Sequence, residues 1–104
     1  MRQVFVMQLR AGFEAEYQSR HEKIWPELTK LLQQYKVSDY HIYLHPVTLQ
    51  LFAFMSTPND FDGEGLKREP LMQRWWKSMA PLMETLPGSN EPMSTPLLPM
   101  FDME

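Results

Sequence analysis

Residues 38–55, SDYHIYLHPVTLQLFAFM, decide the fold because they alternate like two strands joined by a tight turn. The residues of the first run that share one face are Tyr40, Ile42 and Leu44, with His41 and Tyr43 on the other face. The alternation resumes from residue 49 to residue 55. The short connection over residues 45–48 therefore predicts a β-hairpin.

Helical patterns flank this hairpin. Residues 13–35 repeat apolar side chains with a period of about 3.6, which predicts one helix that bends at Pro26. Its apolar stripe contains Phe13, Tyr17, His21, Ile24, Leu28, Leu31 and Tyr35. A second helix is predicted to begin near Glu69 or Pro70. Its stripe contains Met72, Trp75, Trp76, Met79, Leu82, Met83 and Leu86. Between the hairpin and this helix, residues 57–65 have the composition of a loop.

The two ends of the chain supply the remaining extended segments. Val4–Met7 is β-branched and aromatic, as in a central strand. Residues 87–104 form an extended tail that is interrupted by prolines, and residues 97–101 could add a strand that Pro99 confines to an edge. The order βαββα(β) predicts a single α+β domain over residues 1–104. It is a ferredoxin-like sandwich, with an antiparallel sheet and helices on one face.

The predicted strands are apolar on both faces, although helices can cover only one. In the first strand, Val4 and Val6 oppose Phe5 and Met7. A sheet with one face in water would instead alternate apolar with polar residues. An identical subunit is the commonest cover for such a face, so we expect a homodimer with its sheets packed face to face.

Composition excludes several classes of function. Apolar residues make up 43% of the 104-residue chain, enough for a core, and the formal charge of −3 lacks the basic surface of nucleic-acid-binding proteins. Cysteine is absent, which removes disulfides and thiolate chemistry. No apolar run approaches the ~20 residues that span a bilayer, and the start resembles no secretory leader. We therefore expect a soluble, cytoplasmic protein with no membrane or nucleic-acid partner.

One constellation of residues indicates chemistry. His21 lies one helical turn after Tyr17 on the inward stripe, and an inward imidazole needs polar partners. It is either a structural histidine or an acid/base group that titrates near neutrality. Trp75 and Trp76 are either core residues or, as we interpret them, one packing indole and one pocket wall. Asp39 is a possible carboxylate partner, or an ordinary turn residue.

Other kinds of site fit the sequence poorly. His41 and His45 are four residues apart on a strand, a span of about 13 Å that prevents joint metal coordination. The run Gly63-Glu64-Gly65 lacks the strand and lysine of a phosphate loop. We therefore expect neither a metal nor a cofactor.

Several motifs of the chain occur together in one known family. They are Tyr17 to His21, Ile24-Trp25-Pro26-Glu27-Leu28, Asp39-Tyr40, Ile42-Tyr43-Leu44 and Gln73 to Lys77 with Met79. In this set of motifs the chain resembles the L-rhamnose mutarotase family. The resemblance covers the chain from the first strand through the second helix and implies a dimeric α+β barrel. It also implies that the enzyme interconverts the anomers of L-rhamnose without a cofactor. By residue match, His21 is the proton donor and Tyr17, Tyr40, Trp75 and Trp76 bind the sugar.

The corresponding mechanism begins with His21 protonating the ring oxygen, while water, Tyr17 or Tyr40 moves the second proton.

Two other functions compete with this one. Small dimeric α+β barrels also serve as cofactor-free or haem-degrading monooxygenases, with an inward histidine and tryptophans around an apolar cavity. A non-catalytic ligand-sensing module, in which the aromatic residues only pack, is the other alternative.

Overall fold

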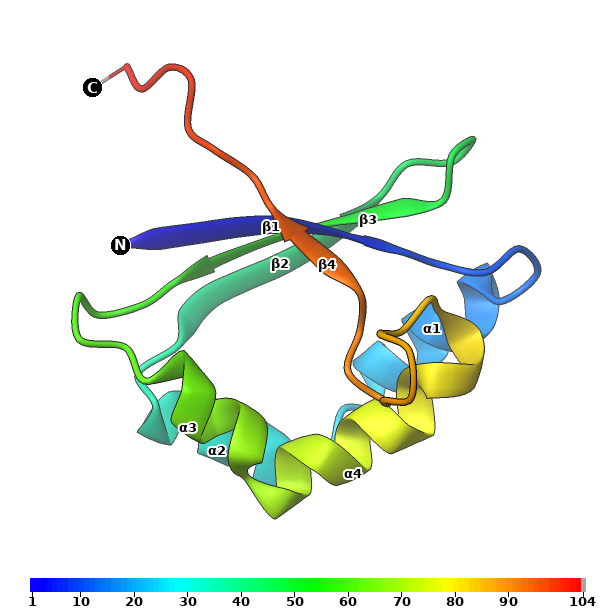
Figure 1. The fold of residues 1–104 in the computed structure, drawn as a ribbon, viewed down its shortest axis with the longest axis horizontal. Coiled ribbons are helices and arrows are strands. Elements are labelled where there is room, and N and C mark those ends of the chain that lie inside the picture. Colours follow the sequence, from blue (N-terminus) through cyan, green and yellow to red (C-terminus); the bar gives the residue numbers. More distant parts are fainter. Residues whose placement is uncertain (104) are drawn as a thin grey trace.

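The computed structural model describes residues 1–103, as a four-stranded antiparallel sheet with its helices on one face (Figure 1). The strands are β1 (Arg2–Gln8), β2 (Ser38–Leu44), β3 (Gln50–Ser56) and β4 (Ser94–Pro96), in the spatial order β2-β3-β1-β4. The helices are α1 (Glu14–Glu22), α2 (Pro26–Gln34), α3 (Gly63–Arg68) and α4 (Pro70–Met79), which continues into a 3-10 turn, η1 (Ala80–Leu82). This arrangement is ferredoxin-like and confirms the predicted α+β class.

The hairpin forms as predicted between β2 and β3. Ile42 lies opposite Ala53 and Leu44 lies opposite Leu51, on the face that the helices cover. A bulge interrupts the register between Ser38 and His41, and Asp39 inside it has a positive φ of 50°. A bulge bends its strand and re-aims the adjoining side chains. Here the adjoining residue is Tyr40.

The prediction of one bent helix over residues 13–35 was wrong, because the structure has two helices. The backbone of Trp25 is extended, with φ −61° and ψ 127°, and Pro26 occupies the first turn of α2. The proline ring disfavours helical geometry in the residue before it. A proline at this position therefore ends one helix and begins the next, where a bend alone was expected.

The second half of the chain differs from prediction in three places. The predicted loop contains α3, whose first turn is capped by Asp62 accepting from the Gly65 N–H at 2.9 Å. The last helix ends near residue 82 and not at Leu86, because Met83 turns out to pair with Leu9 beside the sheet. The edge strand lies at 94–96 and not at 97–101, although Leu97 N still donates to the Val4 carbonyl at 2.8 Å.

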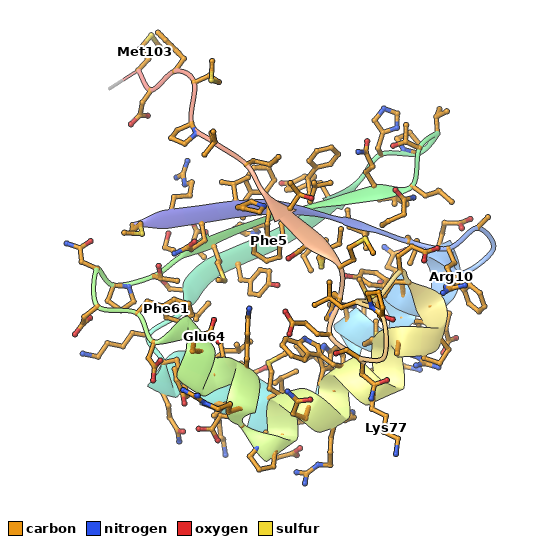
Figure 2. All side chains as sticks on the ribbon, in the orientation of Figure 1. Phe5, Arg10, Phe61, Glu64, Lys77 and Met103 are labelled. Carbon is orange, nitrogen blue, oxygen red and sulfur yellow. The ribbon has the colours of Figure 1, made fainter. Side chains whose placement is uncertain are left out.

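The core fills the space between the sheet and the helices. Phe5 extends from β1 toward the helical layer (Figure 2) and packs against this core. The fully or almost fully buried side chains include Leu28, Leu51, Ala53, Met79 and Leu82. The opposite face of the sheet, here called the outer face, carries Val4, Val6, Phe52, Phe54 and Tyr43, none of them fully buried. None of the helices within residues 1–103 is both long and apolar enough to cross a membrane.

Candidate functional site

The helical layer contains a cluster of four aromatic rings, one of which is the imidazole of His21. The imidazole stacks on the Tyr17 ring with a centroid distance of 4.3 Å, and the Trp75 indole meets it edge-on at 5.4 Å. Trp25 in turn meets Trp75 edge-on at 5.2 Å. Because α1 presents Tyr17 and His21 one turn apart and α4 lies alongside, the fold brings together residues more than fifty positions apart.

A hydrogen bond determines which nitrogen of His21 carries the ring proton. Nδ1 lies 3.0 Å from the Tyr17 carbonyl oxygen, which only accepts, so this bond assigns the ring proton to Nδ1. In the neutral ring, Nε2 is then the acceptor. Burial lowers the pKa of His21 below its ordinary value, and the hydrogen bond to the Tyr17 carbonyl only partly offsets this. The resting imidazole is therefore neutral at pH 7.

Two tyrosines contribute protonated hydroxyls beside this base. Tyr17 is buried, with 8% of its surface exposed, and burial raises its pKa, with a further contribution from Tyr40. Tyr40 lies on the same face of β2 as Ile42, which packs against the core. Burial of the Tyr40 hydroxyl raises its pKa to about 12, although 38% of the residue as a whole is exposed. Both hydroxyls keep their protons at neutral pH.

The two tryptophans of α4 occupy different environments. Trp75 is buried with 7% of its surface exposed and contacts His21, while Trp76 is only partly buried and packs against the core. The Ser78 hydroxyl donates to the Trp75 carbonyl at 2.7 Å near the end of the helix. All five predicted site residues thus come from the helices and from the strand face that these helices cover.

Sequence reasoning did not assign Trp25 to the site. It lies four residues after His21, but the break between α1 and α2 decides where its indole points. A hollow of about 430 Å³ in the helical layer adjoins Trp25 and Trp75. Its other lining residues are Glu16, Ser19, Arg20, Lys23 and Ser78.

Asp39 does not join the ring cluster. Its carboxylate pairs with His41 Nε2 at 2.7 Å, and both side chains are more than half exposed. The two residues line a depression of about 230 Å³ on the outer face, together with Arg2, Tyr43 and Phe54. His45 Nδ1 accepts from the Val47 and Thr48 N–H groups within the hairpin turn. Among residues 1–103, no three His, Asp or Glu side chains are grouped so that they could hold a metal ion.

Comparison with known proteins shows which family the chain is similar to. The model of the L-rhamnose mutarotase family matches residues 2–103. An L-rhamnose mutarotase from Jannaschia sp. is 50% identical over 99 residues, which are 95% of this chain and 94% of that protein. The L-rhamnose mutarotase of Bacteroides thetaiotaomicron is 45% identical over 103 residues, 99% and 98% of the two chains. A crystal structure of an L-rhamnose mutarotase from Formosa agariphila, 38% identical, superimposes with a TM-score of 0.90 and covers 100% of this chain and 99% of that one.

Proposed function

The chain belongs to the L-rhamnose mutarotase family and is an isomerase that interconverts the α and β anomers of this sugar; on this premise we propose that His21 is its acid/base residue. The observation that carries the proposal is the His21 ring itself. Its Nδ1 bonds to the Tyr17 carbonyl, so Nε2 is left to exchange protons beside two protonated phenols. The same relatives favour this function over a monooxygenase or a non-catalytic module.

Anomer exchange requires two proton transfers around one bond. The anomeric hydroxyl loses its proton as the bond between the anomeric carbon and the ring oxygen breaks, and the ring oxygen gains a proton. The open aldehyde then turns, and closure on its other face reverses both transfers. The net reaction consumes nothing, so acid/base groups and a binding surface suffice.

The shifted pKa values of His21 and the two tyrosines indicate which group makes each proton transfer. The neutral Nε2 of His21 takes the proton of the anomeric hydroxyl, and a phenol proton of Tyr40 or Tyr17 goes to the ring oxygen. During closure the phenolate takes the proton back and the imidazolium donates to the new anomeric hydroxyl. His21 is thus the proton donor in the closing half of the reaction. Environments that push the pKa values of two neighbouring groups apart assign one group as the base and the other as the acid.

The aromatic side chains supply the binding surface. Trp75 and Trp76 offer apolar ring faces and one N–H donor each, which suits the C–H face and hydroxyls of a pyranose. Tyr17 and Tyr40 add hydroxyl groups. We propose these four residues as the sugar-binding set, supported by the position of Trp75 against His21 and of Tyr40 near Tyr17.

We further propose that the enzyme works as a cytoplasmic homodimer. The partly exposed apolar side chains of the outer face support an identical subunit packed on that face, with Tyr43 65% exposed. Family membership supports the cytoplasmic location.

Substituting His21 by alanine tests the proposed mechanism. Positioned acid/base groups contribute about 10²–10⁴-fold to rates, so His21→Ala should lose activity on that scale. The exchange rate between the L-rhamnose anomers is measured by saturation-transfer NMR and corrected for the spontaneous rate. His45→Ala is the matched control, because His45 is an exposed turn residue, and it should retain the wild-type rate. Full activity of His21→Ala would overturn the assignment.

A further inference from the structure

Asp39 has an unusual backbone conformation directly beside the proposed site residue Tyr40. Its φ is 50°, in the left-handed region that residues with a side chain rarely adopt. Within residues 1–103 the other non-glycine residues with a positive φ are Lys36 and Leu49, and neither adjoins a proposed site residue. Backbone strain of this kind clusters at active sites and ligand clamps. Strain at Asp39 therefore bears on how Tyr40 is placed.

The bulge at Asp39 decides which face of the sheet Tyr40 occupies. The strand pairs on either side of this bulge are Ser38 with Ser56 and His41 with Phe54. In a regular strand counted from the first pair, Tyr40 would take the position of His41 in the second pair and would lie on the outer face. The bulge adds one residue to β2, so His41 takes that position and Tyr40 turns to the covered face.

The Asp39 side chain is tied to the residue on the far side of Tyr40. Its carboxylate oxygen accepts a hydrogen bond from His41 Nε2 at 2.7 Å. Asp and Asn tolerate the left-handed conformation because their short side chains can bond locally in this way. An exposed pair contributes little to overall stability. The effect of this pair is therefore on the geometry of the bulge that it spans.

We propose that Asp39 is a positioning residue for anomer exchange, acting through Tyr40. Asp39 supplies the backbone conformation of the bulge, and its bond to His41 keeps that conformation in place. Together they fix where the Tyr40 hydroxyl lies against the bound sugar. This inference rests on the proposed role of Tyr40 and adds the residues that place it. Misplacing a reacting group by about 1 Å can cost about 10²-fold in rate.

Three substitutions at Asp39 separate the conformation from the hydrogen bond. Asp39→Asn keeps both, so its rate of anomer exchange should stay within about twofold of the wild-type rate. Asp39→Gly keeps only the conformation and should be slower by about three- to tenfold, as should His41→Ala. Asp39→Ala keeps neither and should be slower by about tenfold or more. Because glycine adopts this backbone without strain, Asp39→Gly remains informative if Asp39→Ala folds poorly.

Lys36→Ala is the matched control for the backbone conformation. Lys36 is also exposed and has a φ of 61°, just after α2, but it adjoins no proposed site residue. This variant should lower the midpoint of urea unfolding, as Asp39→Ala does, because alanine tolerates a positive φ poorly. Its rate of anomer exchange should equal the wild-type rate.

A double-mutant cycle with Tyr40→Phe shows whether Asp39 acts through the Tyr40 hydroxyl. In the Tyr40→Phe background, Asp39→Gly should cause little further loss of rate, because the hydroxyl that Asp39 places is absent. A loss that came from weaker folding or from weaker association of subunits would persist in that background.

The outcomes separate this inference from the proposed function. If Asp39→Gly keeps the wild-type rate, or lowers the rate equally in both backgrounds, the positioning role is wrong and Tyr40 keeps its proposed role. An Asp39→Asn variant as slow as Asp39→Ala would also contradict the positioning role. If Tyr40→Phe keeps the full rate, the proposed role of the Tyr40 hydroxyl fails and the positioning role fails with it. The His21→Ala assay tests the base independently of these results.

Discussion

His21 shows how one side chain acquires its role from its neighbours. Its position on the apolar stripe of α1 withdraws the ring from water, which favours the neutral form. The carbonyl one turn earlier then holds Nδ1, so rotation of the ring is restricted and Nε2 is presented in one direction. Tyr17 serves twice, through its backbone carbonyl and through the ring that stacks on the imidazole.

The lowered pKa of His21 predicts an asymmetric pH dependence. Because the free enzyme needs a neutral imidazole, kcat/KM for anomer exchange should be constant at pH 7–8 and should fall on the acidic side. The inflection should lie below 6.5, the ordinary value for histidine. The tyrosine acid adds no descending limb near neutrality, since burial raises the pKa of Tyr40 to about 12. An inflection above 6.5, or a rate that rises on acidification, would contradict a neutral resting histidine.

At this scale the sequence predicted which side chains share a face within regular elements, and it did not predict side chains at irregular backbone. Tyr17 and His21 could be paired from their spacing because both lie within one regular helix. Tyr40 could be placed on the covered face from strand alternation. Trp25 and Asp39 could not be placed, because each lies where the backbone is irregular. Trp25 precedes a proline, and Asp39 has a positive φ within a bulge.

Among the elements, the break between α1 and α2 matters most for the site. Apolar periodicity runs through residues 13–35 without interruption, so the pattern alone favours one helix. The backbone of Trp25 is extended, and its indole contacts Trp75. We expect a continuous helix to direct this indole elsewhere. The other differences have similar local causes. Pro81 and the pairing of Met83 with Leu9 end the last helix early, and an Asx cap supports a helix within a predicted loop.

Pro26→Ala tests the role of this break. Removing the ring allows α1 to continue through Trp25, which turns the indole away from Trp75, so anomer exchange should fall severalfold. Loss of the proline also raises the conformational entropy of the unfolded chain. The free energy of unfolding, measured in urea, should therefore drop by about 0.4–1 kcal/mol. Pro46→Ala, in the hairpin turn, is the matched control. Pro46→Ala should lower the free energy of unfolding by a similar amount and should keep the wild-type rate of anomer exchange. Equal rates for the two variants would mean that Pro26 does not position Trp25.

In the whole molecule, the sheet separates two functions. Its covered face and the helices hold the five proposed site residues, all from one chain, and the proposed homodimer would use the outer face. This division was visible in the sequence because β1 and β3 are apolar on both faces, which a half-exposed sheet avoids. The relative orientation of two such sheets could not be predicted, because strand alternation orders residues within one sheet and carries no information about the angle to a neighbour.

Val6→Glu separates association from chemistry. Val6 lies on the central strand β1 between Phe52 and Thr95, at the middle of the outer face. In a face-to-face dimer a carboxylate there would be desolvated opposite its two-fold mate, so the dimer dissociation constant should rise about a hundredfold or more. In a monomer the same carboxylate remains partly in water and the fold should survive. Sedimentation should therefore show monomers, with Val47→Glu at the hairpin tip still dimeric. Because no proposed site residue lies on this face, the monomeric variant should keep anomer exchange. Loss of activity in a folded monomer would mean that the second copy completes the pocket.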